Sequence, residues 1–175
     1  MRKKSVVKLV VAALCLALCL ILPFITGQIR EIGNMLCPMH LPVLLCGFLC
    51  GWPYGLAIGF IAPLLRSVLF GMPPLFPTAL AMAFELAGYG FFSGFLFARA
   101  KQGMVQLYAV LVVAMLAGRA VWGLAQLVLL GLSGSAFTLA MFVTGAFSSA
   151  VPGILAQLVL VPLLVTAVRK AKVMA

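Results

Sequence analysis

The stretch KLVVAALCLALCLILPFITG, residues 8–27, decides the fold of this chain. Only Lys8 in it is charged, and the apolar run that begins at Leu9 extends to Ile29. A transmembrane helix needs about 20 mostly apolar residues, so this run is long enough to cross a bilayer. No Ala-x-Ala cleavage site follows it, and we therefore expect a first transmembrane helix rather than a signal peptide.

The rest of the chain has the same apolar character. Of its 175 residues, 66% are hydrophobic and 8% are charged, and the mean hydropathy is +1.30. Soluble domains contain about 25% charged residues, and the strands of a membrane β-barrel alternate between apolar and polar positions. The continuous apolar runs therefore predict an all-α integral membrane protein, with residues 1–175 forming a single transmembrane substrate-binding domain.

Breaks between the apolar runs predict a bundle of six transmembrane helices. Pro53 suits the first turn of a helix, whereas Pro63, Pro152 and Pro162 should kink the helices that contain them. A re-entrant pair over residues 40–71, which would leave four true spans, also fits the pattern. The predicted spans cover approximately residues 8–27, 40–52, 53–71, 78–98, 105–130 and 142–168.

The positive charge lies beside the apolar runs. The formal net charge is +10, and nine of the twelve basic residues form three clusters: Arg2, Lys3, Lys4 and Lys8, then Arg99 and Lys101, then Arg169, Lys170 and Lys172. This arrangement is typical of cytoplasmic loops next to membrane lipid and does not favour nucleic-acid binding. Both termini are therefore expected in the cytoplasm, which six spans, four of them before Arg99, would satisfy.

Sequence motifs of enzymes are missing. Glu31 and Glu85 are the only acidic residues, so the chain has no plausible paired carboxylates, and it contains neither a Walker A nor an HExxH sequence. Cys37 and His40 have a spacing that suits metal binding, but two ligands are too few for a site. We therefore expect no enzymatic activity, no cofactor and no metal centre.

Three charged residues interrupt the predicted spans: Arg66, Glu85 and Arg119. A charge at the bilayer centre costs roughly 2.5–3.5 kcal/mol on insertion scales, so such residues usually face the interior of a helix bundle. The predicted topology places Arg66 and Glu85 in the outer half of the membrane and Arg119 near the midplane. His40 should lie at a similar depth, and we therefore expect these groups to converge toward the exterior.

Helical spacing adds further side chains to this group. Residues three or four apart share a helix face, which aligns Tyr89 with Glu85 and Trp122 with Arg119. Aromatic walls with a few polar groups are typical of pockets for small molecules. The predicted substrate-binding residues are Asn34, His40, Arg66, Glu85, Tyr89, Arg119, Trp122, Gln126 and Gln157.

The charge balance of the three buried residues leaves two interpretations open. Glu85 can pair with Arg66 or with Arg119, and such a pair can simply hold helices together. Two arginines against one glutamate leave one positive charge over, however. An acidic ligand would neutralise it, because a guanidinium binds a carboxylate bidentately. The sequence does not indicate which arginine pairs with Glu85.

Small residues recur at four-residue spacing and predict close helix packing. They are Ala13 and Ala17, then Gly47, Gly51, Gly55 and Gly59, then Gly90 and Gly94, then Ala114 and Gly118. For most of these residues, packing within the bundle is the expected role. Ala13 and Ala17 have an alternative role, because they can face outward to a partner protein.

The chain resembles the substrate-binding S components of energy-coupling factor (ECF) vitamin transporters. Those proteins are small six-helix bundles with cytoplasmic termini, and the resemblance covers nearly the full length. Ala13-Leu14-Cys15-Leu16-Ala17 matches the Ala-x-x-x-Ala motif of the family's first helix. Three further stretches resemble members of the family: residues 39–51 (MHLPVLLCGFLCG), 66–77 (RSVLFGMPPLFP) and 83–87 (AFELA).

The resemblance implies a transport mechanism with named partners. The protein would capture a vitamin outside a prokaryotic plasma membrane and dock through Ala13 and Ala17 onto a transmembrane T subunit. Two ATP-binding cassette ATPases would then drive release inside. The surplus positive charge favours an acid such as pantothenate, nicotinate or folate. A stand-alone carrier or channel is an alternative, as is a metal-uptake subunit, although the latter would need an N-terminal Met-His, whereas Met39 and His40 are internal.

Overall fold

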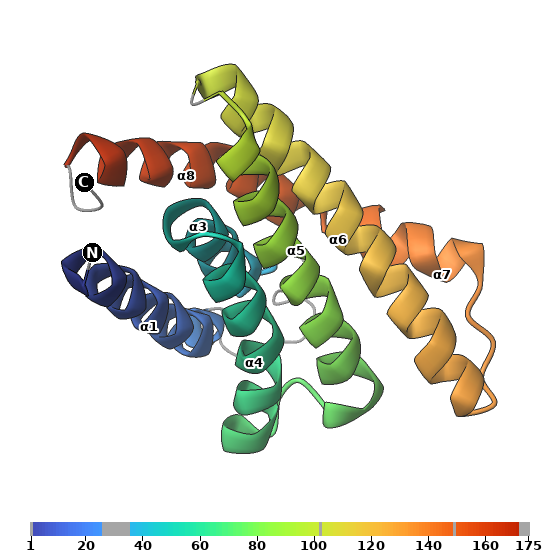
Figure 1. The fold of residues 1–175 in the computed structure, drawn as a ribbon. Coiled ribbons are helices and arrows are strands. Elements are labelled where there is room, and N and C mark those ends of the chain that lie inside the picture. The colour runs from blue at the N-terminus through green and yellow to red at the C-terminus, as the bar shows by residue number, and fades with distance from the viewer. Residues whose placement is uncertain (1, 26–35, 102, 149, 172–175) are drawn as a thin grey trace.

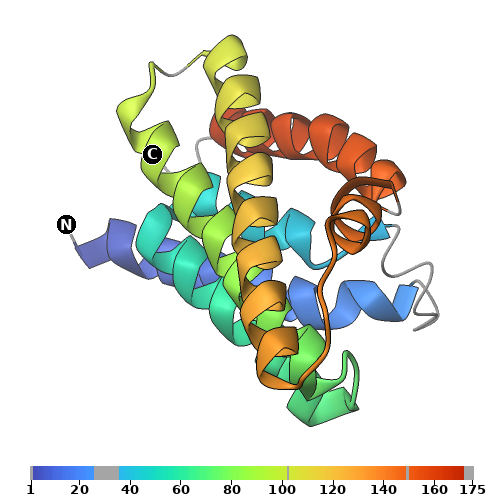
Figure 2. The same cartoon turned by 90° about the vertical axis from the view of Figure 1, so that its right-hand side faces the viewer.

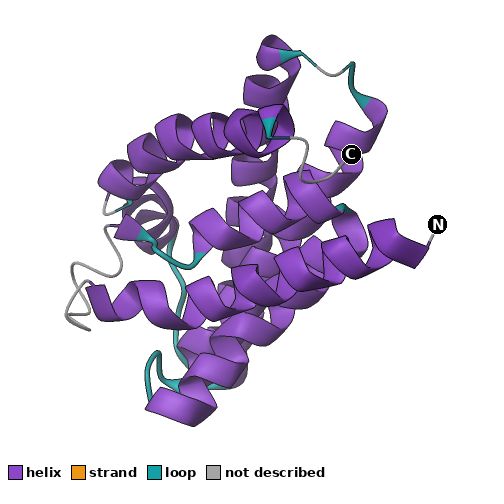
Figure 3. Ribbon diagram, turned by 90° about the vertical axis from the view of Figure 1, so that its left-hand side faces the viewer, coloured by secondary structure: helices purple, strands orange, loops and turns teal. Residues whose placement is uncertain are grey.

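The computed structural model describes residues 2–25, 36–101, 103–148 and 150–171. Within these ranges the regular structure is entirely helical, and no strand is present (Figures 1 and 3). The predicted all-α class is therefore confirmed. The helices lie against one another as an open bundle, with α5 in contact with α3, α4 and α6.

Five of the described helical segments are long and apolar enough to cross a membrane. They are α1 (Arg2–Ile25), α4 (Trp52–Phe70), η1 (Leu75–Ala79) continued by α5 (Leu80–Arg99), α6 (Met104–Leu132) and α8 (Val151–Lys170). The predicted second span is the shorter helix α3 (His40–Cys50), with 11 residues. At 1.5 Å per residue it is about 16 Å long, roughly half the thickness of a bilayer core, so a sixth spanning helix is not confirmed.

Gly51 forms the break between α3 and α4. Its φ of 98° lies in the left-handed region that glycine tolerates, and the chain turns there so that the two helices pack together. Pro53 follows in the first turn of α4, as the sequence predicted. The break between α3 and α4 therefore lies at Gly51, beside the division that the sequence predicted between residues 40–52 and 53–71.

Glycines bring α4 and α5 into backbone contact. A Cβ on Gly55 would lie 2.5 Å from the Gly90 carbonyl oxygen, and a Cβ on Gly59 would overlap the backbone of Leu86. Toward the start of α4, Gly94 packs on the backbone of Trp52. The predicted role of these small residues in close helix packing is confirmed. The contacts fix the position of α5, which carries Glu85, relative to α4.

The basic helix ends gather at one end of the molecule. The Cys50 thiol at the end of α3 lies 3.4 Å from the Lys8 carbonyl oxygen of α1. Arg169 near the end of α8 lies with its Cζ atom 4.5 Å from the ring centroid of Phe97 in α5. The start of α1 and the end of α8 lie on the same side of the molecule (Figures 1 and 2). Clustered basic residues on one side are consistent with the predicted charge asymmetry.

The last predicted span differs from the structure. Instead of one helix over residues 142–168 with a kink at Pro152, the chain forms α7 (Leu139–Val143), the π-helical turn η2 (Thr144–Ser148) and then α8. Pro152 lies in the first turn of α8, where its missing N–H group needs no partner. The proline therefore starts a helix here, and α7 and η2 pass beside α6 before α8 begins (Figure 2).

Candidate functional site

Glu85 and Arg119 form a buried ion pair between α5 and α6. The Arg119 Nη1 atom lies 2.9 Å from Glu85 Oε1, and both side chains are almost fully shielded from solvent. The pair answers the question that the sequence left open, because it identifies Arg119 as the arginine beside Glu85. Each charge compensates the other in a setting where a lone charge would be very costly.

His40, the first residue of α3, joins this pair from a third helix. Its Nε2 atom lies 3.3 Å from the same Glu85 oxygen, and its ring packs edge-on against Tyr89 with centroids 5.1 Å apart. Glu85 Oε1 lies within ion-pair distance of both side chains, although no hydrogen bond is found at this oxygen among the described residues. Of the four residues expected to converge, His40, Glu85 and Arg119 therefore lie together, with Tyr89 beside them, whereas Arg66 does not join them.

Cys37 is a member of the cluster that the predicted set lacks. Arg119 Nη2 lies 3.6 Å from its sulfur, and the residue adopts a left-handed φ of 47° just before α3. Burial raises the pKa of the Cys37 thiol, although the nearby Arg119 charge opposes this shift. The residue is therefore a neutral thiol at pH 7. Its spacing of three residues from His40 is the sequence feature that could have drawn attention to it, but that spacing does not indicate Arg119 as a partner.

Several polar atoms of the cluster and its surroundings remain available. Among the described residues, no hydrogen-bond partner is found for the buried Tyr89 hydroxyl, Arg119 Nε, His40 Nδ1 or Gln157 Nε2. Buried polar groups in native proteins nearly always have a partner, because leaving one unpaired costs about 1–3 kcal/mol. The groups are therefore well suited to hydrogen-bond a small polar molecule.

Arg66 lies apart from this cluster, at the junction of α1 and α4. Its Nη1 atom donates a hydrogen bond to the Leu20 carbonyl oxygen of α1. The guanidinium carbon lies 4.8 Å from the ring centroid of Phe24 and 5.4 Å from that of Phe70. Arg66 is buried as predicted, but it contacts aromatic rings and a backbone carbonyl rather than Glu85.

The other predicted binding residues lie in different parts of the chain and differ in their contacts and burial. Trp122 packs with the rings of Phe137 and Phe142, at centroid distances of 6.0 and 6.1 Å, and so contacts α7 and the loop before it. Gln157 of α8 is buried, and Gln126 of α6 is half-buried with its Oε1 atom shielded from solvent. Asn34 lies outside the described residues.

Helix α1 presents two different faces. Ala12, Cys15 and Cys19 are buried against the rest of the bundle, whereas Ala13 is exposed and Ala17 is half-buried. Leu14 beside Ala13 is 59% exposed, and α1 is the least buried of the candidate spans. The small-residue motif therefore lies toward the outside of the bundle.

Comparison with known proteins identifies the family to which the chain belongs. A family model described as the substrate-specific component of ECF transporters matches residues 7–168. No curated protein and no solved structure matches the chain. In the part of the chain that the structure describes, no three potential ligand side chains gather in a way that could hold a metal ion. The match covers nearly the whole sequence, and the chain therefore belongs to the family of substrate-specific components of ECF transporters.

Proposed function

We propose that this chain captures a small vitamin from outside the cell and that the cluster of Cys37, His40, Glu85, Tyr89 and Arg119 forms the centre of its binding site. The family is one of multi-pass cell-membrane proteins with a substrate-specific role in transport. Within such a protein, a buried polar cluster is the expected place for ligand recognition. Ionisable groups in membrane segments are energetically costly, and those that occur usually mark a functional site.

One observation carries this proposal. The Glu85 carboxylate of α5 contacts both Arg119 of α6 and His40 of α3, and nearby buried polar atoms have no hydrogen bond within the described part of the chain. Glu85 Oε1 lies close to both Arg119 and His40, so the cluster has a fixed charge centre. Among the described residues no hydrogen bond is found at Arg119 Nε or His40 Nδ1, and these atoms provide hydrogen-bonding capacity beside it. A few fixed polar groups among apolar walls give a pocket its orientation and specificity.

The charge balance supports an acidic vitamin, of which pantothenate is an example. Glu85 is the only acidic residue among those described, and it is paired with Arg119. No acidic side chain of the described part is therefore left for Arg66, whose guanidinium lies against the rings of Phe24 and Phe70. We therefore propose that the ligand extends from the cluster toward the α1–α4 junction, where Arg66 can offer its carboxylate a bidentate pair of N–H groups.

The proposal includes the transport partners typical of the family. The protein would dock through the exposed Ala13 face of α1 onto a transmembrane T subunit, and two ATP-binding cassette ATPases would supply the energy. In the proposed topology α3 counts as a short sixth helix and both termini are cytoplasmic. The start of α1 and the end of α8 lie on the same side of the molecule, which supports this arrangement.

Native mass spectrometry of the gently purified protein tests the proposed function directly. We expect a co-purifying small acid whose mass identifies the vitamin, and we expect calorimetry with that compound to show saturable binding. Glu85→Gln should weaken this binding strongly, whereas Phe84→Leu, a change at the neighbouring exposed position, should leave it intact. Equal binding by both variants would contradict the assigned site, and uptake by the chain in vesicles without ATPase partners would contradict the proposed mechanism.

A further inference from the structure

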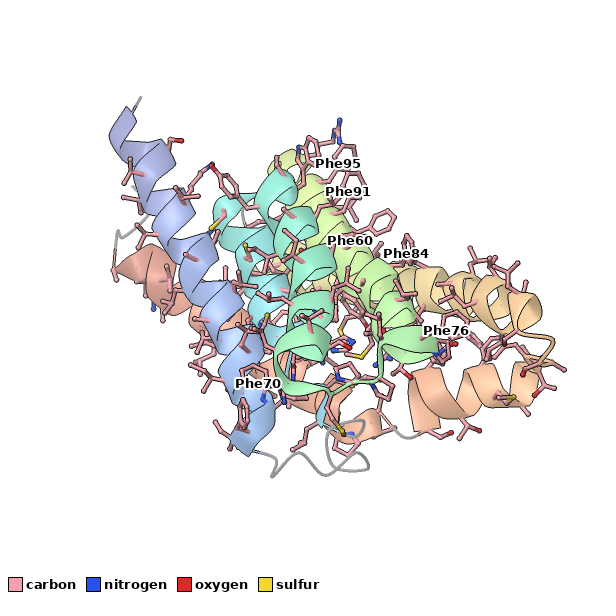
Figure 4. All side chains as sticks on the ribbon, turned by 90° about the horizontal axis from the view of Figure 1, so that it is seen from below. Phe60, Phe70, Phe76, Phe84, Phe91 and Phe95 are labelled. Carbon is pink, nitrogen blue, oxygen red and sulfur yellow. The ribbon has the colours of Figure 1, made fainter. Side chains whose placement is uncertain are left out.

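A stripe of aromatic side chains follows the outer surface of α4 and α5. Figure 4 shows Phe95, Phe91, Phe60 and Phe84 in one row along these two helices. The rings contact one another: Phe91 stacks on Phe95 at 5.1 Å, and Phe60 meets Phe84 at 5.7 Å. Phe60 and Phe84 are exposed, so the stripe faces away from the bundle.

The stripe follows from the way α4 and α5 pack. Their backbones touch at Gly55, Gly59, Gly90 and Gly94, which leaves no room for large side chains in the seam. The bulky rings are therefore confined to the outer edges of the helix pair. Trp52, at the start of α4, continues the row at its basic end, where its ring meets Phe91 at 5.7 Å.

A positive charge lies at this end of the stripe. Arg99 in the last turn of α5 is exposed, and its Cζ atom lies 3.6 Å from the ring centroid of Phe95. Lys101 follows it and is also exposed. Among the described residues Glu85 is the only acid, and it is buried beside Arg119, so no carboxylate of this part is available to Arg99.

We propose that this stripe binds one anionic phospholipid, with the phosphate at Arg99 and an acyl chain along the phenylalanine rings. The surface complements both parts of such a lipid. Its cationic end can bind the phosphate, and its apolar stripe can pack against an acyl chain. Tryptophan and arginine are typical of the level of lipid headgroups, and an anionic headgroup supplies the negative charge that the protein lacks there. The stacked Phe95 ring holds the guanidinium in position for it.

Fluorescence quenching by brominated lipids tests this proposal, because Trp52 lies beside the site. The chain has two tryptophans, so Trp122→Phe leaves Trp52 as the only reporter. The full chain is reconstituted into phosphatidylcholine vesicles that contain equal fractions of brominated phosphatidylglycerol or brominated phosphatidylcholine. We expect about a five-fold preference of the site for the anionic lipid, as one basic residue near a membrane surface provides.

Charge-matched variants give the decisive comparison. Arg99→Gln should abolish the preference for phosphatidylglycerol, whereas Arg169→Gln, which removes the same charge near Phe97, should preserve it. Equal quenching by both lipids, or equal loss in both variants, would overturn the proposal. Quenching by neither lipid together with cross-linked dimers would do so as well, because a second copy would then cover the stripe.

A second measurement needs no tryptophan substitution. Native mass spectrometry of the otherwise unaltered chain with added phosphatidylglycerol should show one retained lipid that Arg99→Gln loses and Arg169→Gln keeps. Retention of the lipid by Arg99→Gln would overturn the proposal even if the Trp122→Phe protein did not fold.

Discussion

Arg119 Nη1 lies 2.9 Å from Glu85 Oε1 on the neighbouring helix, and the same oxygen is 3.3 Å from His40 Nε2. Through these contacts one carboxylate links α3, α5 and α6. The pair therefore has two roles, since it joins helices and also fixes the electrostatic centre of the proposed binding site. Variants that separate charge from shape can distinguish the two roles.

Removal of one partner should be more harmful than removal of both. Glu85→Gln leaves the Arg119 charge buried without a counter-charge, which typically costs about 3–5 kcal/mol. Arg119→Gln leaves Glu85 in the reverse situation. The double variant buries no lone charge and should unfold at a higher denaturant concentration than either single variant. Denaturant melting in detergent, followed by circular dichroism, measures all three proteins, and additive losses would show that the pair is not coupled.

Arg66 should determine the preference of the site for an acid. Arg66→Gln keeps a hydrogen-bond donor but removes the charge, and we expect at least about a ten-fold loss of affinity for the carboxylate ligand, the size of a lost charged hydrogen bond. The neutral amide of the same vitamin should bind both proteins equally weakly. Calorimetry with the acid and its amide makes this comparison. If the acid bound the Arg66→Gln variant normally, the carboxylate would have to contact another group.

The sequence predicted that His40, Glu85 and Arg119 would lie close together, but it did not predict which residues surround Arg66. Positive charges and helix breaks assign His40, Glu85 and Arg119 to similar levels, and the structure brings all three together. Depth does not show which helices are adjacent, however. Arg66 lies on a helix that packs against both α1 and α5, and its contacts with Leu20 and Phe24 show that it faces α1.

Two further differences have local causes. Pro152 was expected to kink a long helix, but a proline is equally well accommodated in a first helical turn, and the preceding segment forms a separate short helix. Cys37 was not among the predicted binding residues, because a single cysteine in a loop carries no signal of a partner 82 positions away. Arg119 reaches it only in the folded chain, where α5 packs against both α3 and α6.

The seam between α4 and α5 should tolerate no added methyl group. Gly90→Ala would place a Cβ into the backbone of Gly55, and overpacking of this kind costs about 1–3 kcal/mol. Gly131→Ala is the matched control, because nothing lies within 4 Å of the added atom on α6. Thermal melting in detergent should therefore show a lower midpoint only for Gly90→Ala. Equal midpoints for the two variants would mean that the helices are less tightly packed than the structure indicates.

The Cys37 thiol should react slowly with alkylating agents. Burial raises its pKa, so at pH 8 the thiolate fraction is smaller than that of a free cysteine, and it grows only as the pH rises further. Arg119 opposes the shift, and Arg119→Gln should therefore reduce the rate further. A variant with Cys37 as its only cysteine allows the rate to be followed by mass spectrometry between pH 7 and 10. Faster labelling in the Arg119→Gln variant would show that the arginine shields the thiol instead of favouring its ionisation.

The outward face of α1 should matter for assembly and not for ligand binding. Ala13 is exposed beside Leu14, and its small side chain leaves a flat surface that a partner helix can approach closely. Ala13→Trp should therefore prevent co-purification with the transmembrane T subunit while the isolated protein binds its vitamin with unchanged affinity. Val105→Trp adds the same bulk at a position on α6 that is 76% exposed, and it should permit assembly. If both variants assembled equally well, α1 would not be the docking helix. Loss of vitamin binding in Ala13→Trp would also contradict the prediction, because Ala13 lies on the face of α1 away from the buried residues Ala12 and Cys15 and should not affect the fold of the subunit.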